Sequence, residues 1–168
     1  MVKLFHFLKK KKEPVKELDF YSVAKGEVIS MDEVNDPVFS KKMMGEGYGV
    51  RPTSSDVYSP VSGVVMSIFP TKHAIGLKTA CGLSILLHLG IDTVELKGAP
   101  FDIKVKEGDR ITPETLIAIM DLEKLAEAGK CSDLVVVITN TADQLETFTL
   151  SNLGNVDKGE LVATAIAK

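Results

Sequence analysis

The side chains best suited to take part in a reaction belong to His73 and His88, two of the three histidines in this chain of 168 residues. Each stands in a segment that alternates or runs apolar in the manner of a β-strand, and the break between the segments, 79–82, is short and ends in Gly82. Two such segments around a short glycine-containing break predict a hairpin. The sequence therefore brings the two imidazoles toward the same end of one hairpin.

The register of this hairpin decides how the imidazoles meet. A turn centred on Ala80 and Cys81 predicts that His73 directly faces His88, with Cβ atoms about 4.5–5.5 Å apart. Alternation places Thr71 on the same side as His73. The other face of the second strand is apolar and is predicted to be core, so the histidine face looks outward or into a cleft; the core face comprises Leu83, Ile85, Leu87 and Leu89.

Three kinds of chemistry suit a pair of adjacent histidines. The pair could be structural, with both rings hydrogen-bonded and inert. It could bind a metal, but a zinc site needs at least three protein ligands as a rule, and only Asp92 is close in sequence. It could relay a phosphoryl group, because a neutral imidazole with an ordinary pKa of about 6.5 is a good nucleophile and its neighbour can steady the transferred charge. The residues alone leave all three open.

Several other chemistries are not indicated. Cys81 and Cys131 lie 50 residues apart and form no zinc-binding spacing, which is typical of a protein from a reducing cytoplasm. No phosphate-cradling GxxxxGK[ST] loop, GxSxG elbow or HExxH helix is present. The sequence thus favours neither ATP as a donor nor a metal-dependent or serine hydrolase.

The distribution of strand and turn signals predicts the fold class. A content of 45% hydrophobic and 26% charged residues is typical of one soluble globular domain. Many short strands with frequent turn residues predict an all-β protein, an antiparallel β-sandwich or flattened barrel with a few short helices. One helix is expected over 37–44, with Asp36 as N-cap and Gly45 as its stop, and another over 122–128, with Asp121 as N-cap.

Charge is distributed unevenly along the chain. Residues 1–12 hold five lysines and no acid, whereas the remainder holds 15 basic and 23 acidic residues. We predict a basic amphipathic N-terminal tail and linker over 1–14, which could lie on an anionic membrane surface or simply be a disordered start, and a single domain over 15–168. The net charge of −3 provides no general attraction to nucleic acid.

A longer pattern surrounds the histidines. His73-Ala74, followed by the run from His88 through Gly90-Ile91-Asp92-Thr93-Val94 to Gly98, resembles the active-site signature of the glucose-type IIA proteins of the bacterial phosphoenolpyruvate-dependent sugar phosphotransferase system. The match extends upstream through 59–63 and downstream through Phe101 and 108–109, so it covers nearly all of the chain beyond the first dozen residues. Fixed Gly, Asp and Thr positions make this run a specific signal.

The resemblance implies a role for each residue of the pair and its surroundings. His88 would accept a phosphoryl group from the phosphohistidine of the carrier protein HPr and pass it to a cysteine on the IIB domain of a sugar permease. His73 would hydrogen-bond the phosphoryl oxygens, and Thr71 would orient His73. Partner docking would involve Asp36, Val38, Phe39, Met43, Met44, Leu86, Asp92 and Val94.

The resemblance also limits cofactors and widens the list of partners. No cofactor is required and no intrinsic metal site is expected, although His73 and His88 could hold zinc with a ligand supplied by a partner. The protein would act in the cytoplasm, where its tail could hold it at the inner face of the membrane. A pure regulatory binder that docks on permeases or kinases without relaying phosphate is the opposing hypothesis. Lys72 departs from the usual pattern and could alter partner preference.

Overall fold

A computed structural model of the chain describes residues 15–168. The predicted membrane-binding tail, residues 1–12, and its linker lie outside the described residues. No helix in the described part is long and apolar enough to cross a membrane.

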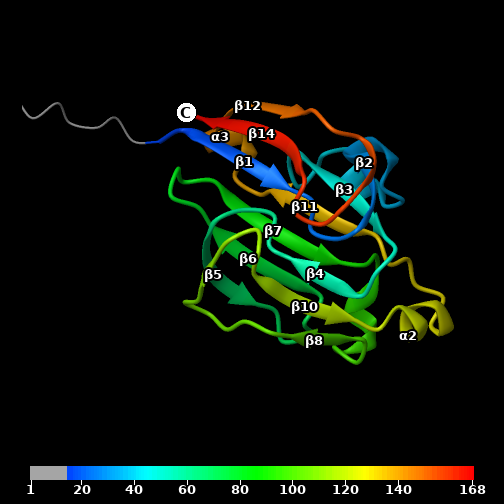
Figure 1. Ribbon diagram of the computed structural model, residues 1–168. Coiled ribbons are helices and arrows are strands. Elements are labelled where there is room, and N and C mark those ends of the chain that lie inside the picture. The colour runs from blue at the N-terminus through cyan, green and yellow to red at the C-terminus, as the bar shows by residue number, and fades with distance from the viewer. Residues whose placement is uncertain (1–14) are drawn as a thin grey trace, which may run out of the picture.

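The largest element of the fold is an eight-stranded antiparallel sheet (Figure 1). Its middle holds β11 (Leu134–Ile138) and, next to it, the predicted hairpin, β7 (Ser84–Leu89) and β6 (Ala74–Lys78). The strands in spatial order are β13 (Gly154–Val156), β2 (Gly26–Ser30), β3 (Gly47–Pro52), β11 (Leu134–Ile138), β7 (Ser84–Leu89), β6 (Ala74–Lys78), β5 (Gly63–Ile68) and β9 (Arg110–Ile111).

Two three-stranded sheets complete the architecture, and all their strand pairings are antiparallel. The predicted all-β antiparallel fold is therefore confirmed. One small sheet has the order β1 (Glu17–Tyr21), β14 (Leu161–Ala167), β12 (Leu145–Leu150), and the other the order β4 (Asp56–Tyr58), β10 (Leu116–Met120), β8 (Phe101–Ile103).

The few helices are short, as the sequence predicts. Both expected N-caps form: the carboxylate of Asp36 accepts hydrogen bonds from the backbone N–H groups of Val38 and Phe39, and that of Asp121 accepts one from Lys124. The first helix ends at Ser40 rather than at residue 44, because Lys42 has a left-handed backbone with φ of 55°. The helices are η1 (Met31–Glu33), α1 (Pro37–Ser40), η2 (Thr93–Leu96), α2 (Leu122–Glu127) and α3 (Thr141–Gln144).

β11 connects the two apolar clusters of the molecule, because all five of its residues are buried. Leu134, Val136 and Ile138 point into the main core between the large sheet and the small ones, whereas Val135 and Val137 point to the other face. There they pack in a second cluster with residues of η1 and α1, including Phe39. This second cluster is what fixes α1 against the outer face of the large sheet.

The register of the β6–β7 hairpin differs by one residue from the predicted register. Ala74, not His73, is paired with His88, and Lys78 is paired with Ser84. The reason is the turn: Gly82 has φ of 89°, and Thr79 bonds to Leu83 across a three-residue loop instead of a two-residue one. The predicted core face of β7 is nevertheless correct, since Leu83, Ile85, Leu87 and Leu89 are all buried.

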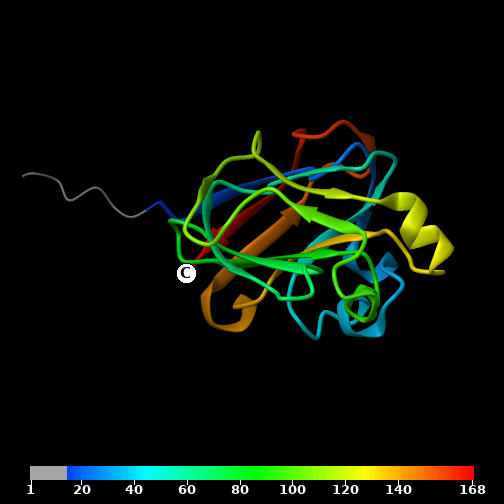
Figure 2. The ribbon, with the colours of Figure 1, turned by 90° about the horizontal axis from the view of Figure 1, so that it is seen from below.

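The histidine end of the hairpin lies at the end of the molecule that also carries α1 and η2. α2 projects from this same end, opposite to the C-terminus, in two perpendicular views (Figures 1 and 2). Three segments that are distant in sequence, 36–44, 69–73 and 88–98, therefore meet there.

Candidate functional site: a pair of imidazoles

His88 is held by the turn that follows β7. Its Nδ1 lies 2.6 Å from the backbone oxygen of Gly90. A carbonyl oxygen can only accept, so Nδ1 must carry the proton that is donated. In the neutral ring, Nε2 is then left with its lone pair exposed to reaction.

The turn depends on glycine at position 90. Gly90 has φ of 74°, and a Cβ there would lie 2.5 Å from Cγ2 of Thr93 and 2.9 Å from the backbone oxygen of Cys131. The hydroxyl of Thr93 donates to the backbone oxygen of Leu89 and ties η2 to the strand end. The Gly90 carbonyl is thus fixed in the position from which it orients His88.

His73 is held by the turn that precedes β6. Its Nδ1 lies 2.5 Å from Oγ1 of Thr71, a hydroxyl that can donate or accept. If the hydroxyl donates, Nε2 of His73 carries the ring proton and becomes a hydrogen-bond donor. Lys72, between them, has a left-handed backbone with φ of 57°, and its N–H donates to the backbone oxygen of Phe69. This bend lets the His73 ring approach His88 although the two residues are not paired.

The imidazoles stand in the middle of a row of four rings. The centroids of His73 and His88 are 5.2 Å apart, so the predicted adjacency holds despite the shifted register. Phe39 packs edge-on against His88 at 5.1 Å, and Phe69 packs edge-on against His73 at 5.2 Å. The two phenyl rings restrict the rotation of both imidazoles.

The surroundings keep both imidazoles neutral. Burial is the largest influence on His88 and lowers its pKa; the neighbouring His73 lowers it further, whereas the Gly90 carbonyl, Asp36 and Asp92 oppose the shift. Burial also lowers the pKa of His73. Because the ordinary pKa is about 6.5, both rings are uncharged near neutral pH.

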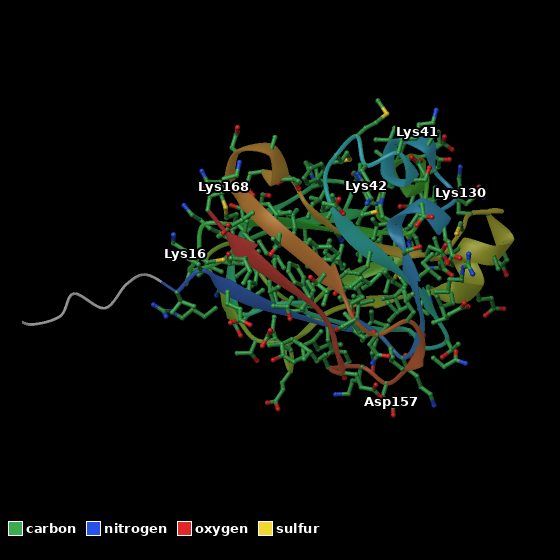
Figure 3. The ribbon with its side chains drawn as sticks, turned by 90° about the horizontal axis from the view of Figure 1, so that it is seen from above. Lys16, Lys41, Lys42, Lys130, Asp157 and Lys168 are labelled. Carbon is green, nitrogen blue, oxygen red and sulfur yellow. The ribbon has the colours of Figure 1, made fainter. Side chains whose placement is uncertain are left out.

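Lysines gather at this end of the molecule. Figure 3 shows Lys41, Lys42 and Lys130 at the opposite end from Lys16 and Lys168. Two of them are paired: Nζ of Lys42 lies 3.1 Å from Glu46, and Nζ of Lys130 lies 2.8 Å from Glu95. Each pair has one well-exposed and one partly exposed side chain, so the pairs contribute little stability.

The residues predicted to dock partners divide into an exposed and a covered group. Val38, Met43 and Val94 are 42%, 71% and 48% exposed, whereas Phe39 is buried against His88 and Met44 is half-buried. Leu86 is half-buried and borders a hollow of about 270 Å³ on the same sheet face as His88. Asp36 caps α1, and Asp92 is exposed at the start of η2.

Sequence reasoning missed Phe69 and the role of Gly90. Phe69 is 39% exposed and touches His73; the sequence placed it at the end of the strand-like segment 63–70, and nothing in that pattern connected it with His73. Gly90 was noted only as part of a motif. A glycine two residues after His88, directly after the end of β7 at Leu89, is the sequence signal that would have indicated a turn whose carbonyl can reach the ring.

No cluster of three or more His, Cys, Asp or Glu side chains within 15–168 is arranged to hold a metal ion. The pair provides two imidazole ligands, one fewer than the usual minimum for zinc. A zinc ion shared with a partner remains a prediction.

Comparison with known proteins identifies the class. The model of the family "phosphoenolpyruvate-dependent sugar phosphotransferase system, EIIA 1" matches residues 18–144, which is most of the chain. The protein belongs to this family.

Particular relatives agree with that assignment. The glucose-specific EIIA component of Staphylococcus epidermidis is 42% identical over 151 residues, covering 90% of both chains. The glucose-specific EIICBA component of Streptococcus pneumoniae is 44% identical over 150 residues, and the chain spans only 20% of that longer protein. The structure of the glucose permease IIA from Mycoplasma capricolum matches with a TM-score of 0.79 and 34% identity, covering 89% of this chain and 96% of that one.

Proposed function

We propose that the protein is a phosphocarrier that accepts a phosphoryl group from phospho-HPr on Nε2 of His88 and passes it to the IIB cysteine of a sugar permease. The observation that carries this proposal is the hydrogen bond between Nδ1 of His88 and the Gly90 carbonyl. It selects Nε2 as the nucleophile, and membership of the EIIA family supplies the context of the transfer.

Each step of the transfer forms one bond to phosphorus as another breaks. The lone pair on Nε2 attacks phosphorus while the P–N bond to the donor histidine breaks, and its electron pair returns to that histidine. The His88 ring then carries positive charge, with the proton still on Nδ1. The Gly90 carbonyl and the carboxylates of Asp36 and Asp92 stabilise this charge. In the second step a cysteine thiolate attacks phosphorus, and the bonding pair returns to Nε2.

His73 would donate a hydrogen bond from Nε2 to the phosphoryl oxygens. This requires Thr71 to donate to Nδ1 of His73, which the 2.5 Å contact allows. Phe39 and Phe69 would keep both rings in position. Burial of the pair supports the same proposal, because a neutral imidazole retains the lone pair that attack requires.

The partners would dock on an exposed apolar rim around the pair. Val38, Met43, Phe69 and Val94 are exposed apolar side chains from the three segments that meet at the site. Exposed apolar groups at one site are typical of protein–protein contacts. We infer that residues 15–168 act as one IIA domain in the cytoplasm, and that any zinc would need a ligand from a partner. The regulatory hypothesis lacks a specific supporting observation.

The test is phosphorylation of the full chain with phosphoenolpyruvate, enzyme I and HPr. Mass spectrometry under alkaline conditions should find an acid-labile phosphoryl group on the peptide that contains His88. A label on His73 or His6, or no label at all, would refute the assignment.

A further inference from the structure

The turn end of the β6–β7 hairpin, opposite to the histidines, carries a second hollow. Its volume is about 610 Å³, and its lining includes Val64 and Met66 of β5, Lys78 of β6, and Arg110 and Ile111 of β9. Volumes of about 300–1,000 Å³ are typical of small-molecule sites. None of its lining residues belongs to the imidazole pair or to the apolar rim.

Strand register arranges the charges of this hollow. Arg110 is paired with Val64, and Val64 is paired with Lys78, so the three side chains form a row across three strands on one face of the sheet. Strands are about 4.8 Å apart, which places the two cationic residues roughly 10 Å apart with Val64 between them. Met66 is 53% exposed and adds to the apolar floor.

Among the residues that the structure describes, the cations of the hollow have no counter-charge. Within 15–168, no carboxylate lines the hollow, and neither Lys78 nor Arg110 takes part in an ion pair. Asp109, next to Arg110 in the chain, accepts a hydrogen bond from the N–H of Lys106 instead. Residues 15–168 together hold 22 acidic and 15 basic side chains, so their net charge is negative, whereas the charged side chains that line the hollow are both cationic.

We propose that this hollow binds a small organic anion with an apolar body, such as an aryl or short alkyl sulfonate, carboxylate or phosphate. The anionic group lies between Lys78 and Arg110, and the apolar body covers Val64 and Met66. Charge-assisted hydrogen bonds from both cations hold the anion, and burial of the apolar body adds to the affinity. The site is independent of the phosphocarrier function, because it shares no residue with the histidine site.

The experiment is a titration of the full-length protein with naphthalene-1-sulfonate, in which NMR spectra record the amide chemical shifts at each step. The expected result is saturable shifts at Gly63, Ala80 and Thr112, which line the hollow. Inorganic sulfate lacks the apolar body and 1-naphthalenemethanol lacks the charge, so each should bind about tenfold more weakly or worse.

The variant Lys78→Gln/Arg110→Gln should weaken naphthalene-1-sulfonate binding about tenfold or more. The matched control is Lys16→Gln/Lys25→Gln, which removes two exposed charges that neither line the hollow nor take part in a salt bridge, and it should bind like wild type. All four replaced side chains are exposed, so both variants should fold. Absence of saturable shifts, shifts centred on Phe69 and Val94, or equal binding by the two variants would overturn the proposal.

Discussion

The end of β7 and the start of β6 each present one imidazole, but the backbone around them constrains the two rings differently. His88 donates a hydrogen bond from Nδ1 to the Gly90 carbonyl, so its neutral ring has a single tautomer. His73 meets a hydroxyl, Thr71, which can donate to the ring or accept from it. The neutral His88 ring therefore always has its lone pair on Nε2, whereas the proton of the neutral His73 ring can lie on either nitrogen.

This difference suits a division of labour. A nucleophile gains from having one fixed tautomer, because Nε2 is always ready to attack. A residue that only steadies charge gains from a partner that follows its protonation state. The same contrast extends to the packing, since the Phe39 that covers His88 is 5% exposed and the Phe69 that covers His73 is 39% exposed. The predictions below test this comparison.

The largest effect is expected from removing His88, the proposed nucleophile. His88→Ala should abolish acceptance of the phosphoryl group, because of the two histidines within 15–168 only His88 has its tautomer fixed by a backbone carbonyl. The measurement is incorporation of radiolabelled phosphate from phosphoenolpyruvate through enzyme I and HPr. Labelling of His88→Ala at the wild-type rate would show that His88 is not the acceptor.

A smaller effect is expected from replacing the second imidazole. His73→Gln keeps a hydrogen-bond donor but cannot carry positive charge, so onward transfer should slow by about 10²–10³, the usual loss for one transition-state donor. Acceptance from HPr should be affected less. Rapid-quench measurement of both half-reactions would show this, and wild-type rates in both would make His73 a structural neighbour only.

A still smaller effect on the transfer rate is expected from changing Thr71, whose hydroxyl is proposed to orient His73. Thr71→Val removes the hydrogen bond to Nδ1 while keeping the shape, and should slow onward transfer about fivefold, since one such bond contributes about 1 kcal/mol. Thr71→Ser, which keeps the hydroxyl, is the matched control and should transfer the phosphoryl group at the wild-type rate. Imidazole ¹⁵N chemical shifts should report a changed tautomer of His73 in Thr71→Val and none at His88; an unchanged tautomer would contradict the orienting role.

The smallest expected effect is on the pH dependence of the free energy of unfolding. Burial lowers the pKa of both histidines in the folded protein below the unfolded value of about 6.5, so the unfolded chain binds more protons at acidic pH. Their contribution to stability is present above that value and is lost as the pH falls through it toward the folded pKa values.

Urea unfolding between about pH 8 and pH 5 should therefore show a smaller acid loss in His88→Gln than in wild type. A control substitution at an exposed site, Lys25→Gln, should leave the pH profile unchanged. A wild-type free energy of unfolding that rises relative to His88→Gln on acidification would contradict the lowered pKa.

Much of this molecule could be predicted from local sequence. Strand and turn signals were sufficient for an all-β antiparallel fold, and Asp36 and Asp121 were identified as helix caps because capping depends on residues only two or three positions away. The apolar face of β7 followed from strand alternation. The spacing of His73 and His88 around a short turn predicted that both imidazoles lie at one end of the hairpin, although their contact also needed the bend at Lys72.

What the tertiary structure decided depends on long-range contacts and on backbone torsions. The positive φ of Gly82 lengthened the turn and shifted the register by one residue, which alternation alone cannot reveal. Phe39 reached His88 because the second apolar cluster, built on Val135 and Val137, fixes α1 more than 90 residues away in sequence. Local sequence determines which strands and caps form, whereas the partners of each imidazole follow from packing between segments that only the folded chain brings together.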